Sequence, residues 1–255
     1  GLGTHLKYYI NEGDTFNDVT PIRKTTTNGV TFSATNGSST ITVTDSSHGA
    51  VINDFVTFSG AVSLGGNITA TVLNQEYQIL TVVNTNSYTI TAKDTSGATV
   101  TANSSDSGNG GSGVDGVYQI NVGLDTVVYN VGWGTDTWGR DTWDSDGTLG
   151  VLSTLRLWSH DNFGEDLLVN VRNGGIYYWD KTLGPSSRAV SLDSLAGASS
   201  TPTVAKQVLV SDRDRHIIAF GCDTESNPGV QDPLAIRFSS QESLTDWDAT
   251  ATNTA

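Results

Sequence analysis

A run of aspartates between residues 136 and 146 is the best candidate for a metal site in this sequence. Thr142-Trp143-Asp144-Ser145-Asp146-Gly147 follows the start of the D-x-D-x-D-G calcium loop, in which oxygens at alternate positions bind the ion. Threonine occupies the first ligand position, however, and Ser153 stands where the bidentate glutamate belongs. We therefore expect an acidic turn without metal. Asp144 and Asp146 remain weak candidate ligands, and calcium in another loop geometry is the alternative.

Three tryptophans, Trp133, Trp138 and Trp143, recur every five residues, a spacing that matches neither a helix nor a strand. On a glycine-containing loop, such rings could form a platform that stacks on sugars. Alternatively, they fill gaps between structural repeats or between subunits, because aromatic anchors dominate interface energetics. We expect the interface role and keep glycan contact as the alternative.

Ser159-His160-Asp161 contains the residue types of a hydrolase triad without its arrangement, because triad members come from separate elements. No G-x-S-x-G nucleophile elbow occurs in the chain. Glu165 and Asp166 could join another acid as a glycosidase pair, but the separation that defines such a pair is not in the sequence. The glycines of 108–113 lack the lysine-serine pair of a phosphate-binding loop. We expect no catalytic residue and no cofactor.

The histidines and the single cysteine favour structural roles. His5, His48 and His216 are scattered, without the spacing of metal ligands on a helix. His48 precedes a glycine and is expected to support a turn. Cys222 ends an apolar run and is expected to be a small buried residue, while a lone cysteine excludes an internal disulfide framework.

Short β-strands must position all these residues, because alternating apolar and polar residues are repeatedly interrupted by turn formers. Residues 39–44 alternate strictly, and Asn84-Thr85-Asn86 predicts a hairpin between strands at 76–83 and 87–91. Further strands are expected at 6–10, 16–20, 29–34, 54–58, 126–130, 167–171, 175–179, 207–210, 217–221 and 235–238. Residues 104–113 predict a flexible loop, and no segment predicts an amphipathic helix. The fold class is therefore all-β.

Charge and hydropathy limit the expected partners of the chain. The net charge of −14 disfavours phosphate backbones and anionic membranes, so we expect no specific nucleic-acid binding. No apolar run is long enough to span a bilayer, so we expect no membrane insertion. The chain has no methionine and begins with glycine, so we expect it to be a piece of a longer protein.

Composition divides the chain into three stretches. Residues 1–25 predict the first strands of a propeller-type blade, residues 26–122 an inserted small β-barrel or β-sandwich module, and residues 123–255 further blades. A weak repeat between residues 3–9 and 173–179 supports blades at both ends. The module is expected to fold alone around a core containing Phe55, Phe58, Tyr77 and Ile79.

The middle stretch resembles a small β-barrel module that recurs in structural proteins of tailed bacteriophages, and a similar module occurs in ubiquitin-activating enzymes. The resemblance lies in the hairpin at 37–44, the His48-Gly49 turn, the strand opened by Asp54-Phe55, Leu73-Asn74-Gln75-Glu76-Tyr77 and the closing hairpin. The flanks, with Gly132-Trp133-Gly134, Trp138-Gly139 and residues 155–167, resemble propeller-bearing tail proteins such as the tail nozzle proteins of short-tailed phages.

The resemblance implies a non-enzymatic virion protein of the phage tail, involved in tail assembly and in host attachment or DNA passage. Its expected partners are further copies of the chain, other virion tail proteins and, at the host surface, glycans. The alternatives are a carbohydrate-binding adhesin that uses the three tryptophans and, as a minor reading, a polysaccharide depolymerase.

Overall fold

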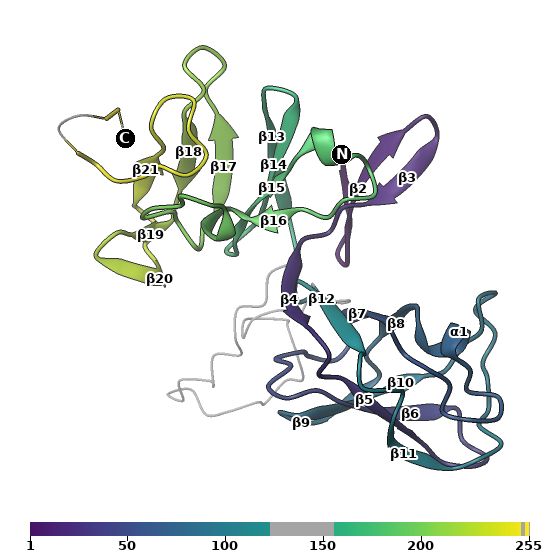
Figure 1. Ribbon diagram of the computed structural model, residues 1–255. Helices are drawn as coiled ribbons and strands as arrows, with labels where there is room; N and C mark the ends of the chain where they lie inside the picture. The colour runs from purple at the N-terminus through teal and green to yellow at the C-terminus, as the bar shows by residue number, and fades with distance from the viewer. Residues whose placement is uncertain (123–155, 251–252, 255) are drawn as a thin grey trace, which may run out of the picture. The chain divides into compact units, whose positions relative to one another are not determined.

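The computed structural model describes residues 1–122, 156–250 and 253–254, and it confirms an all-β fold built from antiparallel sheets (Figure 1). The chain divides into two compact units. Unit 1 comprises residues 1–19, 123–187 and 191–255, and unit 2 comprises residues 20–122 and 188–190.

Unit 2 consists of two open sheets that enclose one hydrophobic core. One sheet has five strands in the order β11-β5-β6-β10-β9, and the other has four in the order β4-β12-β7-β8. Neither sheet closes on itself within the described residues, so the module is a sandwich rather than a barrel. The strands are β4 (Ile22–Thr26), β5 (Thr31–Ala34), β6 (Thr40–Thr44), β7 (Phe55–Ser59), β8 (Glu76–Gln78), β9 (Thr81–Asn84), β10 (Ser87–Thr91), β11 (Asp106–Asn109) and β12 (Asp115–Gln119).

Alternation along these strands places every second side chain in the core. Ile41 and Val43 of β6 are buried while their threonine neighbours face outwards or lie half-buried. In β7 the inward positions are Val56 and Phe58. Phe55 is only half-buried, so its predicted place in the core is wrong, because it lies on the opposite face of its strand.

Several elements of unit 2 differ from the expectation. The strand expected over 76–83 breaks into β8 and β9, since the chain crosses there from one sheet to the other. The loop expected at 104–113 contains β11, which pairs with β5. β4 pairs with β12, so unit 2 begins at residue 20 rather than at residue 26. A short helix, α1 (Ala70–Leu73), is capped by Thr69, whose side chain accepts from the Val72 amide.

The described residues of unit 1 form four sheets, and their orders are β1-β2-β3, β13-β14-β15-β16, β17-β18-β21 and β19-β20. Their strands are β1 (Leu2–Gly3), β2 (Tyr8–Glu12), β3 (Thr15–Asp18), β13 (Trp158–Phe163), β14 (Asp166–Val171), β15 (Ile176–Trp179), β16 (Val190–Ser191), β17 (Gln207–Val210), β18 (Ile217–Phe220), β19 (Asp223–Thr224), β20 (Asn227–Gln231) and β21 (Ile236–Phe238). Two 3-10 turns, η1 (Lys181–Leu183) and η2 (Leu192–Ser194), lie between β15 and β17. The meander order of the larger sheets is one that propeller blades also use, and the propeller itself stays a prediction.

Candidate functional site

The residues singled out first from the sequence lie outside the described part of the chain. Trp133, Trp138 and Trp143, like Asp144 and Asp146, belong to the segment 123–155, which the structure does not describe. Their proposed roles in an interface, in glycan contact or in metal binding therefore stay predictions.

Ser159, His160 and Asp161 lie on β13, and their side chains point to different faces of this strand. Ser159 and Asp161 point the same way: the Ser159 hydroxyl accepts from the Val208 amide at 3.2 Å, and the Asp161 carboxylate accepts from the Val210 amide at 2.8 Å. His160 is exposed and packs edge-on against the ring of Tyr8, with centroids 5.9 Å apart. The histidine is thus directed away from its neighbours, and the serine and aspartate fasten β13 to β17.

Glu165 and Asp166, at the turn between β13 and β14, are both engaged by local partners. Glu165 is exposed and forms an ion pair with Lys181 at 3.2 Å. Asp166 accepts from the Tyr178 hydroxyl at 2.6 Å and from the Lys181 amide at 3.0 Å. Burial, followed by the bond to Asp166, raises the pKa of Tyr178. These contacts fix the hairpin against β15.

His48 supports the turn between β6 and β7, as its position before Gly49 predicted. Its Nδ1 accepts from the Ala50 amide at 3.0 Å and its Nε2 lies 2.9 Å from the Asn84 carbonyl oxygen, an arrangement that fits a neutral ring protonated at Nε2. Arg23 donates to the His48 carbonyl at 3.0 Å, and Lys24 donates to the carbonyls of the two preceding serines. Cations of β4 therefore hold the carbonyls of this turn.

A buried polar network lies beside the turn. The Tyr118 hydroxyl donates to Asp45 at 2.5 Å and lies 2.9 Å from the Tyr88 hydroxyl, while Thr26 donates to the same carboxylate at 2.9 Å. Burial raises the pKa of both tyrosines, and the nearby Asp45 charge adds to the effect. The network joins strands of both sheets, because Tyr118 belongs to β12 and Tyr88 to β10. Its role is structural.

A second carboxylate, Asp223 in unit 1, joins the loop that precedes β17 to the β19–β20 hairpin. Asp223 is buried and accepts from the Thr203 hydroxyl at 2.6 Å and from the Gly229 amide at 2.7 Å. Burial alone would raise the pKa of Asp223, but these and further hydrogen bonds outweigh it and hold the pKa below its usual range. Cys222 beside it is fully buried, and burial raises the pKa of its thiol.

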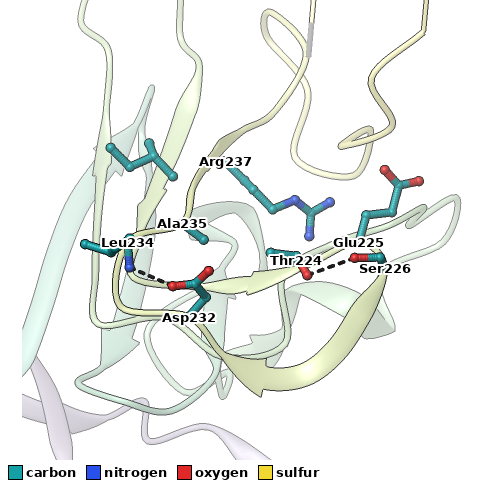
Figure 2. Close-up of a pocket in the computed structure, with 8 residues that line it drawn as sticks. Thr224, Glu225, Ser226, Asp232, Leu234, Ala235 and Arg237 are labelled. Atoms are coloured by element: carbon teal, nitrogen blue, oxygen red, sulfur yellow. Dashed lines mark hydrogen bonds between the residues drawn. The ribbon is translucent and has the colours of Figure 1, made fainter.

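A groove of about 730 Å³ lies between the β19–β20 hairpin and β21 (Figure 2). Its walls are Thr224, Glu225, Ser226, Asp232, Leu234, Ala235, Ile236 and Arg237. The Arg237 guanidinium is held by the carbonyl oxygens of Ser200 and Trp247. The apolar side chains here are unusually open to solvent: in β21, Ile236 is 61% exposed and Phe238 45%, and Leu234 in the preceding turn is 89% exposed. This edge is the candidate functional surface in the described part of the chain.

The sequence contains a signal for this edge that the strand prediction alone does not interpret. Ile236 and Phe238 flank Arg237, and Leu234 continues the alternation before the strand, so the sequence pattern here is apolar at every second position. Such alternation ordinarily marks the buried face of a strand. Whether that face is covered depends on the neighbouring strands, and these are not known from residues 234–238 alone.

The described ranges, 1–122, 156–250 and 253–254, contain neither a candidate metal cluster nor a membrane-spanning helix. No three or more His, Cys, Asp and Glu side chains gather there as a metal ion would require. Of the helices described, none has the length and apolarity to cross a bilayer.

Comparisons with known proteins give little more. No protein-family model matches the chain, and no curated protein matches it. Among solved structures, the chain is similar to the phage phi92 endosialidase at 17% sequence identity and a TM-score of 0.29. The match covers 77% of this chain and 28% of that one, so this chain spans under a third of the length of the endosialidase. A TM-score of this size does not establish a common fold.

Proposed function

We propose that this chain is a non-enzymatic structural part of a phage tail, whose role is to assemble with further copies and with other tail proteins. Its phage origin is supported by the sequence resemblance of the middle stretch, from the hairpin at 37–44 through the His48-Gly49 turn to the closing hairpin. The structural role is supported by how the polar side chains are used.

The observation that carries the proposal is that several reactive side chains among the described residues hold strands and turns. Ser159 and Asp161 bind backbone amides of β17, and Asp166 fixes a hairpin. His48 uses both ring nitrogens on backbone groups of its own turn and of β9. A catalytic base or nucleophile needs a partner on the substrate side, whereas these groups have partners within the fold.

Immunogold electron microscopy of intact phage particles tests the proposal. An antibody raised against the chain should label the tail end of particles produced by the phage that encodes this sequence. Labelling of free protein alone, with particles unlabelled, contradicts a structural role in the tail.

The same protein should be tested on a glycan array and against capsular polysaccharides. We expect no turnover of polysaccharide. Selective glycan binding that is lost in Trp138→Ala would favour the adhesin, and release of reducing ends would favour the depolymerase.

A further inference from the structure

The sequence contains four asparagine–glycine pairs, at residues 28–29, 36–37, 109–110 and 173–174. In such a pair the backbone nitrogen of the glycine can attack the side-chain carbonyl carbon of the asparagine, because a glycine has no Cβ to obstruct the approach. The nitrogen must first be released from any hydrogen bond that its N–H donates within the fold. The hydrogen bonds of the four glycine amides therefore indicate which pair can react in the folded chain.

Three of these glycine amides are engaged by the fold. They donate to backbone carbonyls, Gly29 to Val114 at 3.2 Å, Gly37 to Ala102 at 2.7 Å and Gly174 to Val171 at 2.7 Å. Each nitrogen reacts only after its segment opens locally, and the free energy of that opening slows the reaction.

Gly110 is the exception among the four. Its carbonyl accepts from the Val62 amide at 2.8 Å, whereas its own N–H donates to no acceptor in the described part of the chain. Asn109 before it is exposed and is the last residue of β11. The nucleophilic nitrogen of this pair is therefore the one that the fold leaves without an acceptor.

The end of β11 is also lightly held. β11 is the edge strand of its sheet (Figure 1), and its pairing with β5 is irregular between Asp106 and Asn109. Glycines at 108, 110 and 111 surround Asn109 with positive φ angles of 66°, 112° and 93°. Gly110 itself is buried against the Phe32 ring, so the end of the strand must lift before the nitrogen can turn towards Asn109. An irregular edge strand with three glycines opens at low cost.

We propose that Asn109 is a site of spontaneous deamidation, with Gly110 as the nucleophile and water as the co-reactant. The Gly110 nitrogen forms a bond to Cγ of Asn109 and gives up its proton. The bond between Cγ and Nδ2 breaks, and ammonia leaves with that proton, which closes a succinimide ring. Water then opens the ring at either carbonyl and gives aspartate or isoaspartate. The net change exchanges the amide for a carboxylate and releases ammonia, without an oxidant or a reductant.

The product destabilises the strand in which it forms. Nδ2 of Asn109 donates to both carboxylate oxygens of Asp106, at 3.1 and 2.9 Å. After the reaction these bonds are lost and a second carboxylate faces Asp106, so like charges repel one another. Isoaspartate also lengthens the backbone and disturbs the register with β5. We therefore expect the modified strand to separate from β5 and to uncover Phe32, which is fully buried in the core of unit 2.

Peptide mapping by mass spectrometry, during incubation of the full chain in mildly alkaline buffer, tests the site. In the folded chain Asn109 should convert at least about tenfold faster than each of the other three asparagines. In urea all four should convert at similar rates, because the protecting hydrogen bonds are gone. The three other pairs are thus internal controls. A folded chain in which another pair converts as fast as Asn109, or in which Asn109 stays intact, overturns the proposal.

Two substitutions test the chemistry. Asn109→Gln keeps an amide but lengthens the side chain, which disfavours ring closure, so residue 109 should remain unmodified. Asn36→Gln is the matched control and should leave the conversion of Asn109 unchanged. Release of ammonia from residue 109 at the same rate in Asn109→Gln would contradict attack by the Gly110 nitrogen.

Hydrogen exchange measured by mass spectrometry tests the consequence. Asn109→Asp, which carries the charge of the product, should exchange faster than the wild type in the peptide that contains β5. Asn109→Ser removes the same amide without adding a charge and should have the smaller effect. Equal exchange in both variants overturns the role of repulsion by Asp106. None of these measurements depends on the proposed function, since they follow a reaction within one chain.

Discussion

The two sheets of unit 2 face each other across one core. The larger sheets of unit 1 also share an apolar core, and they are joined in addition by side chains that bond to a neighbour's backbone. In unit 2, Phe32 and Phe58 meet edge-on with their centroids 4.9 Å apart, one from each sheet. In unit 1, the Trp158 indole donates to the Thr4 carbonyl at 2.7 Å. Asp161 binds the Val210 amide on the other side of the same strand.

The difference shows two ways of dealing with open strand edges. A sandwich buries the inner faces of its sheets and keeps its stability in apolar packing. A series of meanders must satisfy the edge of each sheet separately, and β13 does so for β17 with Ser159 and Asp161. The last strand of the third sheet is β21, and no described residue is seen to pair with its outer backbone groups. The position of the open edge therefore follows from the architecture of unit 1.

The largest expected effect concerns the separability of the two units. Residues 20–122 should fold alone, with a cooperative thermal transition and a β-type circular dichroism spectrum, because their core is internal. A fragment that starts at residue 26 loses β4, with its pairing to β12 and the bonds from Arg23 and Lys24 to the His48 turn. It should melt well below the longer fragment. Equal melting temperatures would show that β4 does not contribute to the stability of unit 2.

The next effect concerns the core of unit 2. Phe58→Ala should lower the free energy of unfolding by about 3–5 kcal/mol, since the ring is fully buried. Phe55→Ala, on the other face of the same strand, should cost less, because that side chain is only partly buried. Urea unfolding followed by circular dichroism measures both. A larger effect for Phe55 would contradict the register of β7.

The regular strands were predictable from the sequence because their alternation records which face is buried. Residues 40–44 and 87–91 alternate cleanly and form β6 and β10, which pair in register. β4 and β12 were missed, since Arg23, Lys24 and Gly116 break the pattern. The cations of β4 are explained only by the carbonyls of the His48 turn, some 22 to 25 residues away.

The exposure of the candidate edge was not predictable either, because it depends on contacts between residues that are far apart in the sequence. β21 was expected as a strand at 235–238, and its alternation was plain. An apolar face predicts burial, however, and exposure follows only from the order β17-β18-β21. Similarly, Ser159 and Asp161 were considered only for a hydrolase triad, because their partners Val208 and Val210 lie 49 residues further along.

A smaller effect should appear at the connection between β13 and β17. Asp161→Ala removes the acceptor of the Val210 amide and should cost about 1–3 kcal/mol, the penalty for an unpaired buried donor. Asp161→Asn keeps an acceptor oxygen and should recover part of the loss. Unit 2 contains no tryptophan, whereas Trp158, Trp179 and Trp247 belong to unit 1, so tryptophan fluorescence follows the unfolding of unit 1 separately from that of unit 2. Exposed Asn162→Ala is the matched control.

The smallest effect is a pH dependence carried by Asp223 in unit 1. Hydrogen bonds from Thr203, Val204 and Gly229 hold its pKa below the usual range. The folded state therefore binds this proton less readily than the unfolded state does. The resulting stability is fully present above the ordinary pKa of an aspartate, and it is lost as the pH falls through the lowered value.

Asp223→Asn should accordingly flatten the loss of unit 1 stability between about pH 5 and pH 2. Its stability at pH 7 should be lower than that of the wild type, because an amide group turns one acceptor into a donor facing the Thr203 and Gly229 amides. Tryptophan fluorescence in urea at a series of pH values measures the slope. Residues 20–122 expressed alone, measured at the same pH values, give the reference for unit 2, which does not contain Asp223. An unchanged slope for unit 1 would show that Asp223 holds its loop without contributing to the acid response, and the two units would then differ in packing alone.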